Sequence, residues 1–333
     1  MSLTSLDDKN SPTKNYFLFS LAIFGGFSLL SKSSKFIQSI YPLMVPRPNL
    51  IKTYGKNSWV AITGSSDGLG KQFAHEFSAY GFNCLLIARN ELKIKKVEAE
   101  LKTKFPHIAY KITIADFQKV LEDDFTKNIE KEFKSLDIKI LVNNVGVANV
   151  SNFFSSNESE NKQEIFINSY STVLLSKLFI NTILEKRKSE NSGKYAIINI
   201  GSILGNIPLP YLSIYCGTKA FVNNFSESLY YEFKEKNINI FCLTPYYVST
   251  KMTGFKKLTF DTITPEECVS SAIKQFAKGK KTSSGNWKHE LISLMLGSGY
   301  FKEYLIKKKK DFYKDLVDRA EKINQLRKNR PKK

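Results

Sequence analysis

The chain is poor in the residues on which most metal and redox sites depend. Among its 333 residues there are three histidines and four cysteines. The cysteines, Cys84, Cys216, Cys242 and Cys268, lie far apart in sequence, so no zinc pattern and no CxxC redox motif is present. The histidines also lack the spacing of metal ligands. We therefore expect reduced thiols that lie mostly in the core, no metal site, and no zinc or histidine-based hydrolase.

Acidic residues are scarce relative to basic ones. The sequence has 50 Lys and Arg against 31 Asp and Glu, which gives a net charge of +19. Residues 302–333 alone contain 13 Lys and Arg against 5 Asp and Glu, a surplus of +8. A basic segment of this kind can contact nucleic acid, an anionic membrane surface or an acidic ligand. Composition leaves these three alternatives open.

The sequence also lacks a long apolar run. Its most apolar stretch, residues 16–30, would extend about 23 Å as a helix, against about 30 Å for the hydrocarbon core of a bilayer. Snorkelling of Lys32 and Lys35 would lengthen its reach. A second apolar run, residues 36–45, could lie on a membrane or pack on the protein as an amphipathic helix. We expect residues 1–52 to be a membrane anchor region, with a transmembrane helix and a surface-bound one both open.

Basic residues predict how such an anchor is oriented. Lys32, Lys35, Arg47 and Lys52 follow the apolar run, and by the positive-inside rule they place the main domain in the cytosol.

The other end of the chain has a shorter apolar run. Residues 291–301 are apolar and are followed by Lys302 and by four consecutive lysines at 307–310. A helix of this length cannot span a bilayer, so we expect an interfacial helix with basic residues at the headgroups. A core helix followed by a solvated tail is the alternative. Residues 286–333 are thus predicted to be a basic, membrane-associated tail.

The middle of the chain alternates between strand and helix patterns. Strands are expected at residues 59–63, 83–88, 110–116, 138–144, 194–202 and 237–245, and helices at 71–81 and 91–104. This alternation predicts a Rossmann-type α/β fold with a doubly wound parallel sheet, as a single catalytic domain over residues 53–285. The polar segment 150–163 is expected to form a surface loop.

A glycine-rich sequence, TGSSDGLG at 63–70, lies where the first strand meets the first helix. Gly64, Gly68 and Gly70 allow a tight turn and a close approach to a pyrophosphate, which the helix N-terminus would bind. NAD sites usually have Asp or Glu at the end of the second strand. Here that strand ends in Ala88 and Arg89, and an arginine can pair with a 2′-phosphate. The sequence therefore predicts NADP(H) as the cofactor.

Tyr215 and Lys219 are four residues apart, which places them on one face of a helix. In isolation, such a pair is more often a lysine packed on an aromatic ring. Here it follows TGSSDGLG, NNVG (143–146) and Ser202 in order. Together these motifs resemble the short-chain dehydrogenase/reductase family over residues 57–255.

The resemblance implies roles for individual residues. Tyr215 would donate the proton, Lys219 would be its partner, and Ser202 would orient the substrate carbonyl. Asn168 would hold a water that links the lysine to solvent, Asp116 would contact adenine, and Asn144 would be largely structural. The implied cofactor-binding residues are Gly64, Ser65, Ser66, Asp67, Gly68, Leu69, Gly70, Arg89, Asp116, Asn144, Tyr215, Lys219, Val248 and Thr250.

Several segments are similar to one subgroup, the membrane-bound very-long-chain 3-oxoacyl-CoA reductases, which merge with 17β-hydroxysteroid dehydrogenase type 12-like proteins. They are GSSDGLGK, LVNNVG, IYCGTKAFV and LTPYYVSTKM. The resemblance implies NADPH-dependent reduction of 3-oxoacyl-CoA in fatty-acid elongation at the endoplasmic reticulum membrane, with the catalytic domain facing the cytosol. Its implied partners are the acyl-CoA or steroid substrate, membrane lipid and elongation enzymes, with a homodimer left open and no nucleic acid.

Two alternatives are kept beside this hypothesis. One is a hydroxysteroid or retinoid dehydrogenase on the same scaffold, since the catalytic residues do not distinguish these substrates. The other is a non-catalytic scaffold that binds membranes or nucleic acid, against which the complete Ser202, Tyr215 and Lys219 set argues.

The proposed acid must match neutral pH. A free tyrosine has a pKa of about 10. A lysine charge at about 4 Å, in an effective dielectric of about 20, would favour tyrosinate by about 4 kcal/mol. We therefore expect Lys219 to bring the pKa of Tyr215 near 7.

Overall fold

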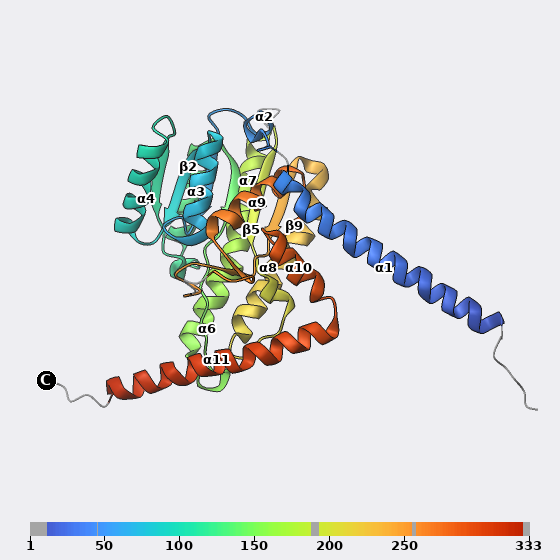
Figure 1. Ribbon diagram of the computed structural model, residues 1–333. Helices are drawn as coiled ribbons and strands as arrows, with labels where there is room; N and C mark the ends of the chain where they lie inside the picture. The colour runs from blue at the N-terminus through green and yellow to red at the C-terminus, as the bar shows by residue number, and fades with distance from the viewer. Residues whose placement is uncertain (1–11, 45, 188–192, 255–257, 329–333) are drawn as a thin grey trace, which may run out of the picture.

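A seven-stranded parallel sheet forms the centre of the computed structural model, which describes residues 12–44, 46–187, 193–254 and 258–328 (Figure 1). The strand order is β3-β2-β1-β4-β5-β6-β9. The strands are β1 (Trp59–Thr63), β2 (Asn83–Ala88), β3 (Tyr110–Ile114), β4 (Ile138–Asn143), β5 (Tyr195–Ile200), β6 (Ile238–Leu243) and β9 (Thr282–Ser283). A separate pair, β7 (Tyr247–Val248) and β8 (Thr262–Ile263), forms a small second sheet. The predicted Rossmann-type fold is confirmed.

Helices connect and cover the strands. They are α1 (Pro12–Met44), α2 (Leu50–Tyr54), α3 (Gly68–Tyr80), α4 (Glu91–Lys104), α5 (Asp123–Ser135), α6 (Glu158–Ile165), α7 (Ser171–Arg187), α8 (Ser213–Phe233), α9 (Pro265–Ala277), α10 (Trp287–Met295) and α11 (Gly299–Lys328). Short helical turns, η1 to η5, occupy Phe117–Lys119, Phe153–Ser155, Phe166–Tyr170, Ile203–Asn206 and Lys234–Lys236. The first eleven residues of the predicted anchor and the last five of the predicted tail lie outside the described part of the chain.

Both faces of the sheet are buried, because successive side chains of a strand point to opposite sides. Val60 and Ile62 of β1 join the core beneath α3, α4 and α9. Ala61 joins the core on the other face, beneath α5 and α7. Strands buried on both faces read as continuous apolar runs, which is why β1 and β2 were predicted at their observed bounds. All four cysteines are buried and unpaired, as expected.

The motif residues meet at one edge of the sheet. Gly64 follows β1, Arg89 follows β2, Asn144 follows β4 and Gly201 follows β5. The strands are parallel, so their carboxyl ends lie on the same side of the molecule. β1 lies between β2 and β4 in the sheet, and the chain moves outward in opposite directions from this point. Ligands of doubly wound sheets bind at such a switch point.

The polar segment 150–163 is only partly the surface loop expected from the sequence. Its second half enters α6 (Glu158–Ile165). Asn157 caps the first turn by accepting two backbone N–H groups, and Glu158 pairs with Lys162 at 2.7 Å. Capping and charge pairing of this kind stabilise a helix that has few apolar residues.

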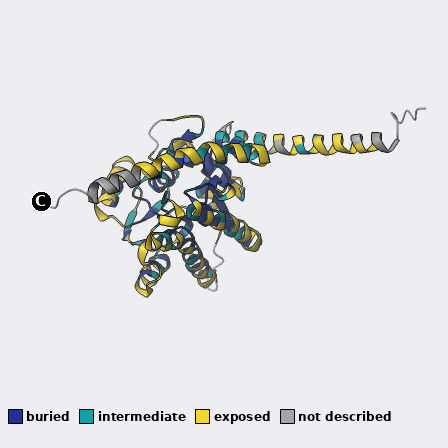
Figure 2. Ribbon diagram, turned by 90° about the horizontal axis from the view of Figure 1, so that it is seen from below, coloured by how far each residue is buried: buried dark blue, intermediate teal, exposed yellow. Residues whose placement is uncertain are grey.

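The two apolar runs near the N-terminus belong to one helix. α1 (Pro12–Met44) packs at its end on α9 and α10, where Lys278 Nζ lies 3.6 Å from the ring centroid of Tyr41. The rest of α1 points away from the domain and is largely exposed (Figures 1 and 2). Within the described residues, no helix has the length and apolar character needed to cross a membrane. The transmembrane alternative for residues 16–30 is therefore not found in this part of the chain.

The basic end of the chain packs on the domain. α10 ends at Met295 and α11 begins at Gly299, so the predicted interfacial helix at 291–301 is interrupted. Ile292 of α10 and Tyr313 of α11 are buried in a core cluster at the carboxyl edge of the sheet. These contacts cross the predicted domain boundary at residue 285.

Candidate active site

The turn between β1 and α3 has the shape of a phosphate cradle. Gly64 and Gly68 have φ of +63° and +53°, in the left-handed region that favours glycine. A Cβ added at Gly70 would overlap the Gly64 carbonyl oxygen and the side-chain nitrogen of Asn144. The Asp67 carboxylate accepts from the Gly68 N–H at 2.9 Å and caps α3. The turn therefore fits a dinucleotide pyrophosphate, as predicted from its glycines.

Two predicted cofactor residues hold this turn in shape. Asn144 Nδ2 donates to the carbonyl oxygens of Thr63, at 2.8 Å, and Gly64, at 3.3 Å. The Thr63 hydroxyl accepts from the Asn144 N–H at 2.9 Å. Ser65 is fully buried, and both its N–H and its hydroxyl donate to the Ile87 carbonyl oxygen at 3.3 Å. Asn144 and Ser65 thus act on the backbone of the turn.

A cavity of about 480 Å³ opens at the ends of β2 and β3 and is lined by Ser66, Arg89, Lys93 and Asp116. The Arg89 Nη1 atom lies 3.9 Å from the Asp116 carboxylate. Because Arg89 is 65% exposed, this ion pair is weak, and the guanidinium can turn toward a 2′-phosphate. Lys93 supplies a second cation that the sequence analysis did not assign. This cavity fits the adenosine end of the predicted NADP(H).

Most of the predicted site residues share one cavity of about 250 Å³. The predicted residues that line it are Gly64, Asp67, Gly68, Leu69, Asn144, Ser202, Tyr215, Lys219, Val248 and Thr250. Tyr215 and Lys219 come from the first two turns of α8, and Ser202 follows β5. The Ser202 hydroxyl accepts from the Leu204 N–H at 3.1 Å and donates to the Pro245 carbonyl oxygen at 3.2 Å. The structure therefore brings the predicted acid, its partner and the carbonyl-orienting serine to the glycine-rich turn.

Burial dominates the electrostatics of this group. The Lys219 ammonium donates to the Ile200 carbonyl oxygen at 2.7 Å and lies 5.7 Å from the Tyr215 ring centroid. Burial lowers the pKa of Lys219 to about 8. Burial also raises the pKa of Tyr215 above its ordinary value, and a hydrogen bond with Ser202 opposes this only in part. The expectation that Lys219 brings the Tyr215 pKa near 7 is therefore wrong for this structure, because burial raises this pKa more than the Ser202 hydrogen bond lowers it.

Asn168 lies in a π-helical turn, Phe166–Tyr170, between α6 and α7. Its Oδ1 accepts from the Val147 N–H at 2.8 Å, and its Nδ2 donates to the Val147 carbonyl oxygen at 2.9 Å and to the Thr218 hydroxyl at 3.1 Å. A Cβ at Gly146 would lie 3.2 Å from Asn168 Oδ1 and 3.7 Å from Lys219 Nζ. Asn168 is thus placed beside the lysine, and π turns are frequent at functional sites.

The segment after β7 closes the cavity opposite the glycine-rich turn. The Thr253 hydroxyl donates to the Val248 carbonyl oxygen at 2.7 Å. Thr250 Cγ2 lies 3.2 Å from the position of a Cβ at Gly68. Val248 and Thr250, two of the implied cofactor-binding residues, therefore line the same cavity as the glycine-rich turn.

Asn223 of α8 is a residue of the site that the sequence analysis missed. Its Oδ1 accepts from the Ser202 N–H at 3.2 Å, and its Nδ2 donates to the Ser202 carbonyl oxygen at 2.9 Å. A Cβ at Gly201 would overlap the Asn223 amide. Asn223 thus fixes the backbone that carries the predicted catalytic serine. The signal in the sequence was the pair Gly201 and Gly205, which flank Ser202 and leave space for a close neighbour.

Glu164 of α6 was also missed. It is 1% exposed, and its carboxylate accepts from the Asn149 N–H at 3.4 Å. Burial raises its pKa to about 7, and the charge of Lys219 opposes that shift. A buried carboxyl group near the predicted catalytic residues has no signature in the sequence, because Glu164 lies in a polar, helix-capped segment.

Known proteins resemble the chain in both sequence and structure. Residues 58–259 match the family described as short chain dehydrogenase. A human protein named very-long-chain 3-oxoacyl-CoA reductase is 34% identical over 248 residues, which are 73% of this chain and 75% of that protein. A rat protein named 17-beta-hydroxysteroid dehydrogenase type 3 is 32% identical over 269 residues, 78% of this chain and 84% of that protein. A solved short-chain dehydrogenase from Sphingobium yanoikuyae, in complex with NADPH, is 25% identical with a TM-score of 0.61, covering 68% of this chain and 87% of that one.

Proposed function

Because this chain belongs to the short-chain dehydrogenase/reductase family, we propose that it is the NADPH-dependent reductase that converts a very-long-chain 3-oxoacyl-CoA to the 3-hydroxyacyl-CoA. The observation that carries the proposal is the shared cavity, where Ser202, Tyr215 and Lys219 meet the glycine-rich turn. The relative of that name and the NADPH complex of a structural neighbour support the substrate class and the cofactor.

The reduction needs a hydride at the carbonyl carbon and a proton at the carbonyl oxygen. NADPH, when bound, supplies the hydride. Tyr215 gives its phenolic proton to the oxygen, and the raised pKa of Tyr215 keeps that proton in place until it is needed. When the ketone binds, the Ser202 hydroxyl keeps its Leu204 contact and turns its proton from the Pro245 carbonyl oxygen to the substrate oxygen, where it stabilises the charge that develops.

Lys219 and Asn168 restore the acid after each turnover. The Lys219 ammonium has its pKa lowered to about 8, so it is charged at neutral pH and can supply a proton. Asn168 lies beside it, held by Val147 on both its amide atoms. Because its side chain is fixed, Asn168 can hold the predicted water that links Lys219 to solvent.

A hydroxysteroid dehydrogenase is the second candidate, since the rat 17-beta-hydroxysteroid dehydrogenase type 3 is 32% identical over 78% of this chain. The two candidates share every catalytic residue. They differ in the ketone that fits beside Tyr215 and in the segment after Thr250.

Turnover of the two ketones distinguishes these candidates. Detergent-purified protein is offered NADPH with a long-chain 3-oxoacyl-CoA and, separately, with a 17-keto steroid. The rate of NADPH oxidation is followed by its loss of absorbance. We expect kcat/KM to be at least about tenfold higher for the acyl-CoA, and about tenfold lower with NADH, because Arg89 and Lys93 face the 2′-phosphate position. Turnover of the steroid alone would reject the acyl-CoA substrate but keep the mechanism.

We also propose that the protein sits on the endoplasmic reticulum membrane through α1, with the catalytic domain in the cytosol. Large apolar side chains exposed along α1 support this, among them Phe17, Phe24 and Phe27 at 64%, 72% and 72%. Their replacement by serine should move the protein from the membrane pellet to the supernatant, while the domain keeps its NADPH affinity. An unchanged pellet fraction would reject α1 as the anchor. Contacts with elongation enzymes and a homodimer stay predictions.

A further inference from the structure

The helices α10 and α11 are connected to the active site through the small two-stranded sheet of β7 and β8. β7 (Tyr247–Val248) and β8 (Thr262–Ile263) pair in parallel, with Tyr247 opposite Thr262 and Val248 opposite Ile263. β7 leads into the Val248–Thr250 segment, which lines the catalytic cavity. The position of this two-stranded sheet therefore sets the position of one wall of that cavity.

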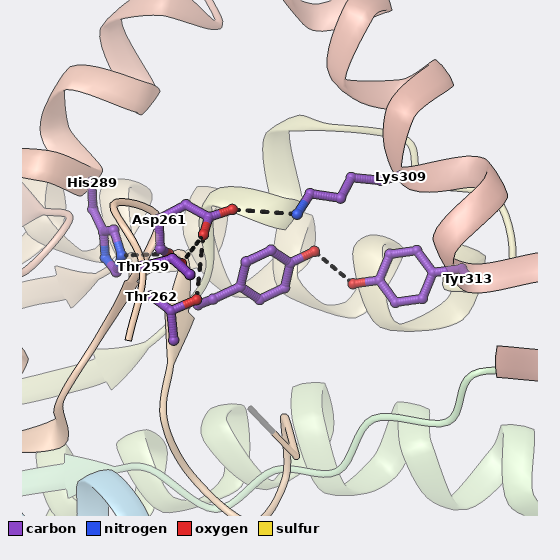
Figure 3. Close-up of polar contacts among 7 residues, drawn as sticks. Thr259, Asp261, Thr262, His289, Lys309 and Tyr313 are labelled. Carbon is purple, nitrogen blue, oxygen red and sulfur yellow. Dashed lines mark hydrogen bonds and ion pairs between the residues drawn. The ribbon is translucent and has the colours of Figure 1, made fainter. Parts of the chain in front are cut away.

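α11 contacts β7 and the residue before β8 from one face of the helix. The Tyr313 hydroxyl lies 2.7 Å from the Tyr247 hydroxyl, on β7. The Lys309 ammonium lies 3.3 Å from the carboxylate of Asp261, the residue before β8. Lys309 and Tyr313 are four residues apart, so they project from the same side of the helix (Figure 3).

Lys309 differs from the other lysines of its run. Its side chain is 15% exposed, and its ammonium lies 4.5 Å from the Tyr247 ring centroid. Lys307, Lys308 and Lys310 are exposed. A cation that is mostly removed from water and lies over an aromatic ring, with a carboxylate partner, is held in a defined place.

His289 of α10 makes a similar connection between the residues that precede β7 and β8. His289 is fully buried, and its Nδ1 accepts from the Tyr246 N–H at 3.2 Å. Burial lowers the pKa of His289 to about 4, so the ring is neutral at pH 7 and its other nitrogen carries the proton. That nitrogen, Nε2, donates to the Asp261 carbonyl oxygen at 3.2 Å (Figure 3). Through these contacts, both α10 and α11 connect β7, or the residue before it, with Asp261, the residue before β8.

We propose that Lys309 and Tyr313 are positioning residues of the reductase, which hold the β7–β8 sheet so that Val248 and Thr250 keep their place against the glycine-rich turn. The consequence is that α11 is part of the catalytic unit. The closeness of Thr250 to Gly68 gives the reason, since a shift of β7 would move Thr250 away from the cofactor cradle. The proposal rests on the proposed function for its kinetic readout alone.

The test uses the full chain and three substitutions that remove single groups. Lys309→Met keeps the apolar stem and removes the charge, Asp261→Asn removes the partner charge, and Tyr313→Phe removes one hydroxyl. Lys308→Met, an exposed lysine of the same run, is the matched control. NADPH affinity is measured by quenching of tryptophan fluorescence, and the KM and kcat for the ketone are measured separately.

We expect the NADPH Kd and the ketone KM to rise about three- to tenfold in Lys309→Met and in Tyr313→Phe, and to stay unchanged in Lys308→Met. The Lys309→Met, Asp261→Asn double variant should show no larger effect than the worse single variant, because the pair acts as a unit.

The proposal is overturned if all of the variants lower the melting temperature but leave Kd and KM within twofold of the original protein. That result would mean that α11 only stabilises the fold. Should Lys309→Met fail to fold, Tyr313→Phe decides, since it removes a hydroxyl and no packing atoms. The NADPH Kd needs no turnover, so a wrong substrate assignment does not affect this outcome.

Discussion

Replacing Tyr215 by phenylalanine should lower kcat for ketone reduction by about 10²- to 10⁴-fold, because it removes the acid that protonates the carbonyl oxygen. The ring and its packing on α8 remain, so the NADPH Kd and the free energy of unfolding should change little. Burial keeps the phenol protonated at neutral pH, which suits a proton donor. The measurement is single-turnover NADPH oxidation with saturating ketone.

The matched control is Tyr231→Phe, which removes a hydroxyl from the same helix at a position 57% exposed. We expect its kcat to stay within twofold. If Tyr215→Phe retained kcat within threefold of the original protein, another group would have to supply the proton. Glu164 would then be the first residue to examine, since its pKa of about 7 also matches an acid.

Replacing Gly70 by alanine should weaken NADPH binding at least about tenfold and destabilise the fold by about 1–3 kcal/mol. The added Cβ would overlap the Gly64 carbonyl oxygen and the Asn144 amide, both of which belong to the turn itself. The turn must open to accept the methyl group, and it then no longer fits a pyrophosphate. Kd from fluorescence quenching and urea unfolding measure the two effects.

Gly217→Ala in α8 is the control for this change, since a Cβ there meets nothing within 4 Å. In a helix, this substitution should stabilise the protein by about 0.5–1 kcal/mol. An unchanged NADPH Kd in Gly70→Ala would mean that the dinucleotide does not lie in this turn.

The fold was predictable where local pattern and burial agree. β1, β2 and α4 have their predicted bounds, because continuous apolar runs and an N-capping Asn90 mark them clearly. α6 was missed because its sequence has few apolar residues, and its helix depends on Asn157 and on charge pairs.

The candidate site was predictable to the extent that a short motif contains it. Tyr215 and Lys219 are fixed by one helical turn, so their proximity follows from spacing alone. Asn223 lies beside Ser202 only because α8 packs against the end of β5, a contact between distant segments. The Tyr215 pKa failed as a prediction for a related reason, since spacing gives the distance to a charge but not the degree of burial.

The lysine run at 307–310 shows a further feature that could not be predicted from the sequence. Four consecutive lysines at 307–310 read as one solvated cluster, and nothing in the run distinguishes Lys309 from its neighbours. Only the rotation of α11 against Asp261 and Tyr247 selects the one that lies inward.

The contacts of Lys309 and Tyr313 have a consequence for how the site forms during synthesis of the protein. Synthesis proceeds from the N-terminus, so the seven-stranded sheet leaves the ribosome before α11 does. A nascent chain that ends before residue 309 contains the glycine-rich turn, Ser202 and Tyr215, yet lacks both side chains that hold β7 and β8 from α11. The wall of the catalytic cavity is therefore completed only after α11 has been made, and a chain that stopped before residue 309 would lack the contacts that hold this wall.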